Sequence, residues 1–381
     1  MTRLFHLLVK FLIGGFSMGI KMRFFFVLFC VAFFVVPNPL LAQEGFSARR
    51  VDATITEIKS IQELEGGVFQ YTFTAKSEYG EDFFVETTNS FIAGVGYTLQ
   101  VGDEVSLRVI DVEDGLEVYF DDVHRQRGLW WIVGFFVALT LLVGWVRGLL
   151  SLIGLCVTVA ILVLGLFPAI VRGVDPVYAA VTASALILFV NMHLSHGMNR
   201  RTFLAFLSTL GGLGCVLMFT KVFLWIARLS GLASEEGSFL FWKLDPVQAP
   251  VGILAAGIIL GAVGVLDDIA ITQSETVGEL RLANPRATRR ELFTQAMRIG
   301  RHHIASTVNT LILVYAGAAL PVFLLFMNQF GSTHEFLQNE LVAEELVRTL
   351  AGTCALVLLV PLSTWLATCD IKVIDNPLKQ P

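Results

Sequence analysis

Seven long apolar segments occupy most of the chain after residue 128 and restrict what it can fold into. They cover residues 129–146, 148–171, 177–194, 202–227, 246–266, 304–327 and 346–367. An α-helix rises about 1.5 Å per residue, so about 20 residues cross the bilayer hydrocarbon, which is about 30 Å thick. Because 55% of the 381 residues are hydrophobic and only 15% are charged, a water-soluble fold is disfavoured. We expect an α-helical polytopic membrane protein with about seven transmembrane helices.

Basic residues predict how these segments are oriented. Connections with Arg147, Arg200 and Arg201, and a loop with six arginines over residues 281–301, alternate with turns that are richer in glutamate. Cytoplasmic loops of membrane proteins carry an excess of Lys and Arg. We therefore expect a multi-pass membrane protein with a cytoplasmic C-terminal tail over residues 370–381.

Residues 1–42 are typical of a signal or anchor segment. Lys21 and Arg23 precede an apolar run of 13 residues, which has the length of a signal-peptide core and is short for a span. Ala42 suits the last position before a cleavage site, whereas Leu40, two positions earlier, is larger than the residue preferred there. Cleavage and retention as an anchor both stay open. In either case we expect the residues that follow to lie outside the cytoplasm.

Residues 46–124 alternate apolar and polar side chains with a period of two. The clearest stretches are VDATITEI, FQYTFTA, DFFVETT, EVSLRVIDV and LEVYF, and glycine-containing turns separate most of them. This alternation is typical of β-strands with one buried face. We expect a small extracytoplasmic β-barrel, OB-like or SH3-like, which serves either as a partner or lid domain or as a spacer. The transmembrane helical domain is expected over residues 129–369.

Two adjacent carboxylates, Asp267 and Asp268, follow the apolar segment 246–266. A helix that begins at the start of this segment places them roughly 32 Å further along its axis, at the inner edge of the hydrocarbon. A row of small residues on the same helix consists of Gly257, Gly261 and Gly264. Such a face lets a neighbouring helix approach closely.

Polar residues also gather at the predicted inner ends of segments 177–194 and 304–327. Together with the two aspartates they define a candidate polar vestibule: Asp267, Asp268, Asn309, Thr310, His302, Arg301 and His193. Polar groups at this depth are costly unless they face a cavity or each other. Two interpretations stay open. One is a site for an ion, a proton or a solute, and the other is a set of acid–base pairs with Arg298 or Arg301 that pins two helices together.

Motifs for catalysis and cofactor binding give little support for an enzyme. His302 and His303 are adjacent rather than three or four residues apart, so metal ligation is weakly supported and no cofactor is expected. The sequence has neither the HExxH motif of zinc proteases nor the GxxxxGK[ST] phosphate loop of NTPases. Asp267 and Asp268 point about 100° apart on one helix, unlike the facing carboxylates that share a proton in aspartyl proteases.

Five stretches of the sequence carry a specific resemblance to a known family. They are HLSHGMNRRTFLAFLSTLGG, LSGLASEE, GIILGAVGVLDDIAITQSETVGELRLANP, RRELFTQAMRIGR and STVNTLILVYAGAALPVFLL. In these residues the chain resembles the YibE/F-like family of bacterial membrane proteins, which has no established activity. The resemblance implies a multi-span protein of the bacterial cytoplasmic (inner) membrane, preceded by an extracytoplasmic β region. It matches Asp267 to a recurrent family acid and Asn309 and Thr310 to an Asn-Thr pair, whereas His302 stands where members commonly have an acid.

These features lead to two hypotheses about function. The first is a permease or channel-like transporter with a cytosol-facing polar vestibule that attracts a cation or relays protons. The alternative is a non-transporting membrane scaffold whose β domain recruits an envelope partner. The expected partners are the lipid bilayer, a small ion or solute, an envelope protein and a second copy of the chain in a homo-oligomer. Nucleic acid is not expected as a partner.

Overall fold

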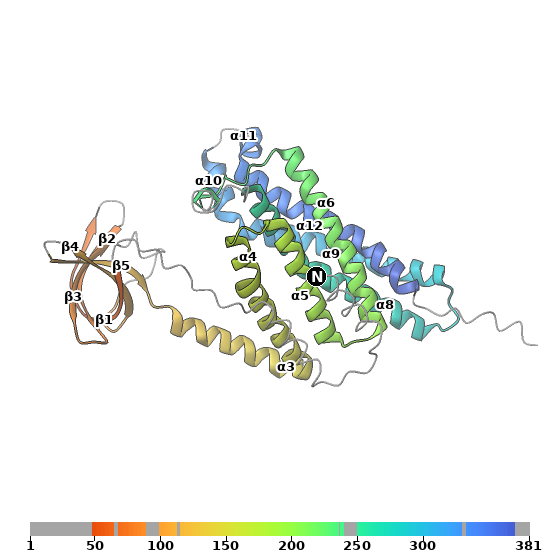
Figure 1. Cartoon of the computed structure of the whole chain (residues 1–381), viewed down its shortest axis with the longest axis horizontal. Coiled ribbons are helices and arrows are strands. Elements are labelled where there is room, and N and C mark those ends of the chain that lie inside the picture. The colour runs from red at the N-terminus through yellow and green to blue at the C-terminus, as the bar shows by residue number, and fades with distance from the viewer. Residues whose placement is uncertain are drawn as a thin grey trace, which may run out of the picture. The chain divides into compact units, whose positions relative to one another are not determined.

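The computed structural model describes residues 48–64, 68–88, 99–112, 115–235, 237–239, 250–329 and 333–369 (Figure 1). The predicted signal or anchor segment and the predicted C-terminal tail lie outside these residues. The chain divides into two compact units: a β unit, Pro37–Val143, and a helical unit, Gly144–Pro381 together with Met1–Val36.

Five antiparallel strands form one sheet in the β unit. They are β1 (Ala48–Leu64), β2 (Val68–Ser77), β3 (Asp82–Thr88), β4 (Glu104–Val112) and β5 (Gly115–Val123). The long strand β1 pairs with both β2 and β4, which gives the order β3-β2-β1-β4-β5. The edge strands β3 and β5 contact each other, so the sheet curls into a half-barrel (Figure 1).

Alternating side chains build the core of the half-barrel. Tyr71, Phe73 and Ala75 on β2 are at most 1% exposed, and they pack with buried residues of the other strands. Successive residues of a strand point to opposite faces, so the residues between them face outward. The turn from β2 to β3 is closed by Gly80, whose φ of 87° suits glycine and whose N–H donates to the Ser77 carbonyl at 3.0 Å.

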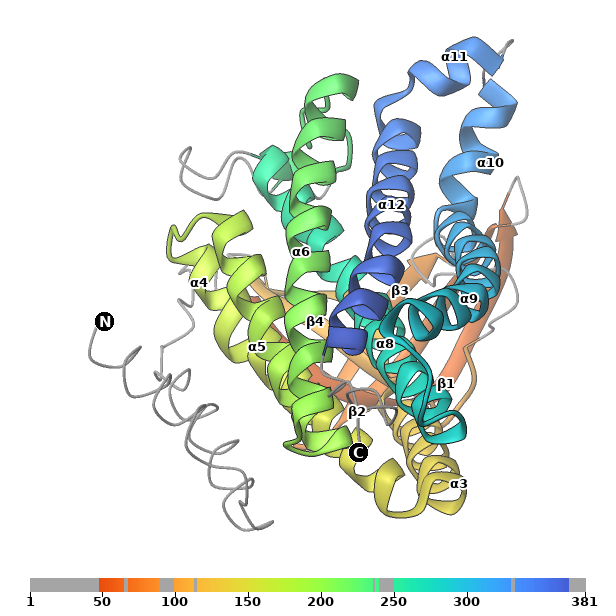
Figure 2. The same ribbon diagram turned by 90° about the vertical axis from the view of Figure 1, so that its right-hand side faces the viewer.

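Helices make up the rest of the described chain (Figure 2). They are α3 (Gln126–Ala160), the π-helical turn η1 (Ile161–Leu166), α4 (Phe167–Val171), α5 (Pro176–His196), α6 (Arg200–Ala227), α8 (Pro250–Ala283), α9 (Arg289–Ala318), α10 (Leu320–Gln329), α11 (Thr333–Gln338) and α12 (Glu340–Cys369). Capping residues fix several helix starts. Asp175 accepts from the Tyr178 N–H, and Thr288 and Glu291 form a capping box at the start of α9.

Helix α8 lies at the centre of the helical unit. It contacts α5, α6, α9 and α12 (Figure 2), and part of its buried residues belong to a large apolar cluster that also includes residues of α3, α5, α6 and α12. Small residues let the helices approach closely: a Cβ on Gly352 of α12 would lie 3.6 Å from the Cβ of Ala262 on α8. Close packing of this kind holds α8 in one orientation relative to its neighbours.

Several helices in the described residues are long and apolar. Five pass the length and hydropathy requirements for crossing a membrane, and six do so if α9 and α10, which are bent by 66°, count as one span. The predicted segments 129–146 and 148–171 fall in a single run, Gln126–Val171, which is broken by non-helical backbone at Trp145 (φ 48°, ψ −131°). The predicted segment 304–327 contains the bend between α9 and α10.

Candidate functional site

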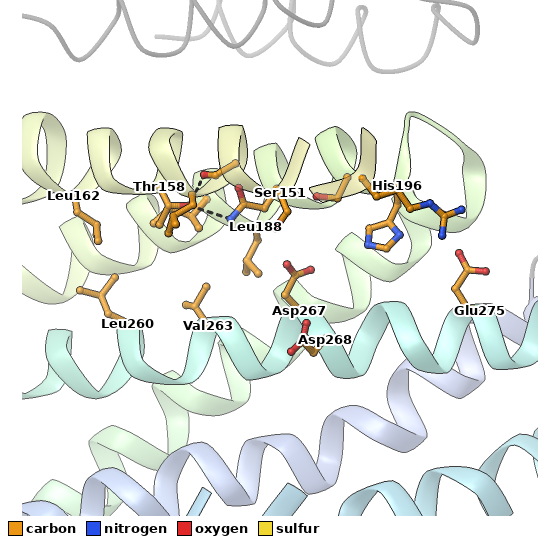
Figure 3. Close-up of a pocket in the computed structure, with 17 residues that line it drawn as sticks. Ser151, Thr158, Leu162, Leu188, His196, Leu260, Val263, Asp267, Asp268 and Glu275 are labelled. Carbon is orange, nitrogen blue, oxygen red and sulfur yellow. Dashed lines mark hydrogen bonds between the residues drawn. The ribbon is translucent and has the colours of Figure 1, made fainter. Parts of the chain in front are cut away.

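A cavity of ≈ 920 Å³ lies between α3, α5 and α8 of the helical unit (Figure 3). Its apolar walls come from leucine, isoleucine and valine side chains of η1 and all three helices. Its polar and charged lining residues are Arg147, Ser151, Thr158, Asn191, Ser195, His196, Asp267, Asp268 and Glu275. A hollow of this volume, with an apolar lining and a few polar groups, has the character of a site for a small molecule or ion.

Asn191 on α5 is held in the cavity wall by α3. Its Nδ2 donates to the Thr158 hydroxyl at 3.0 Å, and that hydroxyl donates to the Gly154 carbonyl at 3.0 Å. Gly154 is required for this approach, because a Cβ there would lie 2.9 Å from Asn191 Oδ1. The amide is therefore fixed through its nitrogen. Its Oδ1 is buried and accepts no hydrogen bond from the residues that the structure describes.

Asp267 presents a second oxygen of the same kind from α8. Its Oδ1 is buried and has no hydrogen-bond partner among the described residues, and its side chain lines the same cavity as Asn191 (Figure 3). A buried polar atom without a partner costs free energy, and most such atoms in folded proteins are satisfied. Two residues that line the cavity therefore each carry a buried acceptor that lacks a donor or a cation in the described residues.

The charged lining residues favour positive ligands. The cavity has three carboxyl groups, on Asp267, Asp268 and Glu275, against one guanidinium, on Arg147. Asp268 is more exposed than Asp267 and interacts electrostatically with the imidazoles of His303 and His196. Groups of three or more His, Cys, Asp or Glu side chains placed to hold a metal ion are not found in the described part of the chain.

Four predicted vestibule residues lie elsewhere, on α9. Arg301, His302, Asn309 and Thr310 are exposed and do not line this cavity. Thr310 donates its hydroxyl to the Ser306 carbonyl at 3.0 Å within its own helix. The buried face of α9 is a different one, formed by Leu292, Ala296, Gly300 and Leu311. The structure therefore does not bring these four residues together with the two aspartates in this cavity.

His193 also lies outside the cavity. It is 8% exposed, its Nδ1 is 2.8 Å from the Phe189 carbonyl oxygen, and its ring stacks against Phe189 at a centroid distance of 4.5 Å. Phe206 covers another side of the ring, at 5.8 Å. His193 is thus a packed core residue in the interface of α5 and α6. Its neighbour His196, one turn away, lines the cavity instead.

The acid–base pinning expected from the sequence is not what holds α8 to α9. In the described ranges, neither aspartate forms an ion pair with Arg298 or Arg301. The two helices are joined instead by Gln273, whose Nε2 donates to the Ala296 carbonyl at 3.0 Å and whose side chain is 2% exposed. The aspartates are therefore left available to the cavity.

Sequence reasoning missed the contribution of α3 to this site. Arg147, Ser151 and Thr158 follow one another at helical spacings on that helix and all line the cavity. Gly154 and Thr158, four residues apart in an otherwise apolar segment, were the available signal. Asn191 carried a similar signal as an amide near the end of an apolar run.

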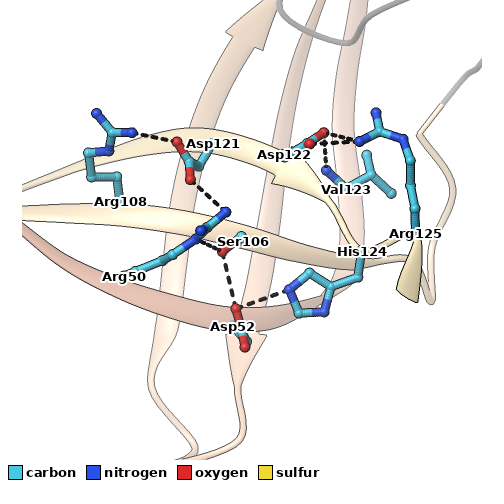
Figure 4. A network of polar contacts seen from close by, with 9 residues as sticks. All are labelled: Arg50, Asp52, Ser106, Arg108, Asp121, Asp122, Val123, His124 and Arg125. Carbon is cyan, nitrogen blue, oxygen red and sulfur yellow. Dashed lines mark hydrogen bonds and ion pairs between the residues drawn. The ribbon is translucent and has the colours of Figure 1, made fainter. Parts of the chain in front are cut away.

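The β unit carries a second, surface cluster of polar contacts (Figure 4). Asp121 pairs with Arg50 at 2.9 Å and with Arg108 at 2.7 Å, so one carboxylate joins β1, β4 and β5. The Arg125 guanidinium, which donates to Asp122, holds the pKa of that carboxyl below its ordinary value, against a smaller opposing effect of burial. These contacts stabilise the strand order.

Fold and site together define a mostly helical protein with several apolar helices, a polar cavity between three of them and an N-terminal half-barrel sheet. Comparison with known families gives a match to the YibE/F-like protein family over residues 132–372, and the chain belongs to that family. The matched range contains every lining residue of the cavity. No curated protein and no solved structure matches the chain.

Proposed function

We propose that the chain is an integral membrane protein whose helical unit is a permease or channel-like transporter. The cavity between α3, α5 and α8 is its binding chamber, reached from the cytosol. The observation that carries the proposal is that Asn191 and Asp267 line one cavity and that each has a buried Oδ1 without a partner in the described part of the chain. Leaving two acceptors unsatisfied costs about 1–3 kcal/mol each, and a ligand that donates to them recovers this free energy.

The proposed topology has seven spans and an extracytoplasmic sheet, formed by strands β1 to β5. The break at Trp145 divides the run Gln126–Val171 into two spans, and the bent pair α9–α10 makes one more. With the remaining four helices this gives seven crossings. Arginines near residues 147, 200 and 281–301 then lie on the cytoplasmic side of the inner membrane. We assign the β unit to the OB type, because a central β1 between β2 and β4, with β3 and β5 at the seam, is the strand arrangement of that barrel.

The cavity lining indicates the kind of solute. Three carboxyl groups against one guanidinium attract positive charge, and both free acceptors require a donor. The apolar lining suits a small organic amine, and the same acceptors suit a hydrated monovalent cation or a proton. All three are positively charged, and each either donates a hydrogen bond to an oxygen or is coordinated by one.

Flux through reconstituted vesicles tests this proposal. Proteoliposomes with the full chain are assayed for uptake of Na⁺, K⁺, protons and a series of small amines. We expect flux above that of empty vesicles for at least one probe, and loss of that flux in Asp267→Asn. The matched control is Asn309→Ala, which removes a polar side chain of the same helical unit that lies outside the cavity. Flux equal to that of empty vesicles for every probe, or equal flux in wild type and Asp267→Asn, overturns the proposal.

A second candidate function is a scaffold, and one feature of the β unit favours it. A cavity of ≈ 730 Å³ lies at the seam between the edge strands, lined by Glu86 and Thr87 of β3 and by Tyr119, Phe120 and Asp121 of β5. Edge strands carry unpaired backbone groups, and an extended segment of an envelope protein can pair with them.

Site-specific crosslinking tests the scaffold function. A photoreactive benzoylphenylalanine replaces Tyr119 at the seam or, as the control, Tyr79, which is 81% exposed and lies outside that cavity. We expect a discrete crosslinked partner from the seam position alone. The same adducts from both positions, or none from either, contradict the scaffold function.

A further inference from the structure

Glu344, near the start of α12, is a buried acid outside the cavity described above. The residue is only 6% exposed, and its Oε1 is buried without a hydrogen-bond partner in the described residues. The Ala233 N–H, from the segment between α6 and α8, donates to the same carboxyl group. One oxygen is therefore satisfied and the other is not.

The groups that face Glu344 do not neutralise it. On its own helix it has two carboxylates, Glu340 and Glu345, and one guanidinium, Arg348, as charged neighbours. Arg348 pairs with Glu345 at 3.4 Å, and the Glu340 carboxylate accepts from the Ser230 N–H. An ionised carboxylate in this position would be buried beside two like charges, and the one neighbouring cation, Arg348, already pairs with Glu345. Burial of a charge under those conditions is strongly unfavourable.

A row of glycines on α8 connects this cluster with the cavity. A Cβ on Gly257 would lie 3.3 Å from Arg348 Nη1, and a Cβ on Gly261 would lie 3.0 Å from the Tyr315 hydroxyl. The third member, Gly264, lines the cavity that contains Asp267. Positions i, i+4 and i+7 share one face of a helix. Gly257 and Gly261 therefore make room for polar side chains of α12 and α9 rather than for the backbone of a neighbouring helix.

We propose that Glu344 is a second site of the helical unit, one that binds and releases a proton, and that the row Gly257–Gly261–Gly264 couples it to the cavity through Arg348 and Tyr315. From Gly257 to Asp267 the axis of α8 rises about 15 Å, so the two acids lie at different depths. The coupling, but not the proton site, rests on the transport function proposed above. If Glu344 and the cavity are coupled in this way, movement of the solute depends on a proton at Glu344.

Carbodiimide modification of the detergent-purified full chain tests the proton site without any measurement of flux. Dicyclohexylcarbodiimide reacts with protonated carboxyl groups in apolar surroundings, and peptide mass spectrometry locates the adduct. We expect a Glu344 adduct several-fold more abundant than that on Glu345, which pairs with Arg348, and its loss as the pH is raised. An equal adduct on both residues, or a Glu344 adduct that does not change with pH, overturns the proton site.

Two variants separate a proton site from a structural role of the same carboxyl group. Glu344→Gln keeps an oxygen that accepts from the Ala233 N–H but cannot release a proton, and Tyr315→Phe keeps the ring but removes the hydroxyl at Gly261. In proteoliposomes with a K⁺ diffusion potential, we expect both variants to reduce proton entry several-fold. Tyr178→Phe, at a tyrosine 65% exposed on α5, is the matched control and leaves proton entry unchanged.

The outcomes of the two experiments are distinct. Proton entry unaffected by Tyr315→Phe overturns the coupling row while pH-dependent labelling still supports the proton site. Vesicles without any proton entry contradict proton coupling, whereas selective and pH-dependent labelling of Glu344 is unaffected by that result. Glu344→Gln that matches wild type in proton entry, together with labelling that does not depend on pH, shows that the carboxyl group serves only to hold the Ala233 segment.

Discussion

Asn191 and Asp267 face one cavity from two different helices, and each has a buried oxygen without a partner in the described residues. The relationship depends on α3, because Thr158 holds the amide nitrogen of Asn191 and leaves the oxygen turned away from that bond. A purely structural role would favour satisfying these oxygens within the protein. Their pairing in one hollow is therefore the main physical evidence for a ligand.

The unsatisfied carboxylate predicts opposite effects on stability and on function. We expect Asp267→Asn to raise the free energy of unfolding by about 1–3 kcal/mol, because it removes a buried charge without a partner, while it abolishes flux. Thermal unfolding of the detergent-purified chain measures the first effect. Asp268→Asn is the control, since that side chain is more exposed and a change within about 0.5 kcal/mol is expected. A destabilised Asp267→Asn would show that the carboxylate has a partner in the folded protein.

A methyl group added at Gly154 on α3 should displace the side chain of Asn191. In Gly154→Ala the new Cβ would lie 2.9 Å from Asn191 Oδ1, so the amide must shift and its bond to Thr158 is strained or lost. We expect a several-fold loss of flux and a destabilisation of roughly 1–3 kcal/mol. Gly214→Ala on α6 is the matched control, because its Cβ would meet no described atom within 4 Å and alanine favours a helix. Equal behaviour of the two variants would mean that Asn191 is not held as described.

Local patterns in the sequence predicted the elements well. Period-two alternation placed all five strands, since burial of one face depends only on the strand itself. The expected turn at residues 146–148 lies next to the break at Trp145, although the 129–146 and 148–171 segments form one apolar run and no proline marks the change of direction. Apolar composition measures the length of a helix but does not show where its backbone departs from helical geometry.

The sequence predicts only in part which residues line the cavity, because it does not show how each helix is rotated about its own axis. Helical spacing puts Asn309 and Thr310 on two neighbouring rows of α9, but it cannot show which neighbour those rows meet. The rotation of α9 is set by Ala296 and Gly300, which pack against α8 and α12, and the polar row is left exposed. Asp267 and Asp268 line the cavity because the apolar contacts of α8 fix the rotation of that helix about its own axis.

The Asp122–Arg125 pair predicts a small dependence of stability on pH. Because the folded-state pKa of Asp122 is lowered, the pair stabilises the fold above the ordinary carboxyl pKa of about 3.9, and this contribution is lost as the pH falls through the lowered value. We expect Asp122→Asn to destabilise the chain at neutral pH by less than about 0.5 kcal/mol, since the side chain is 47% exposed, and to match wild type well below pH ~3. Circular dichroism of thermal unfolding at the two pH values measures the difference. A difference that grows on acidification contradicts the assignment.

Gly300 lies at a position where the helical unit has little room for added volume. A Cβ at this position of α9 would lie 2.7 Å from Val360 Cγ1 on α12 and 2.9 Å from Gln273 Nε2 on α8. The Gln273 amide is already committed to the Ala296 carbonyl, so Gly300→Ala must push α12 away or break that bond. We expect a loss of roughly 1–3 kcal/mol in thermal unfolding, from overpacking of a buried contact. Gly317→Ala on the same helix should be neutral or stabilising, because its Cβ would meet no described atom within 4 Å. Equal melting temperatures for the two variants would mean that α9, α8 and α12 do not meet at Gly300.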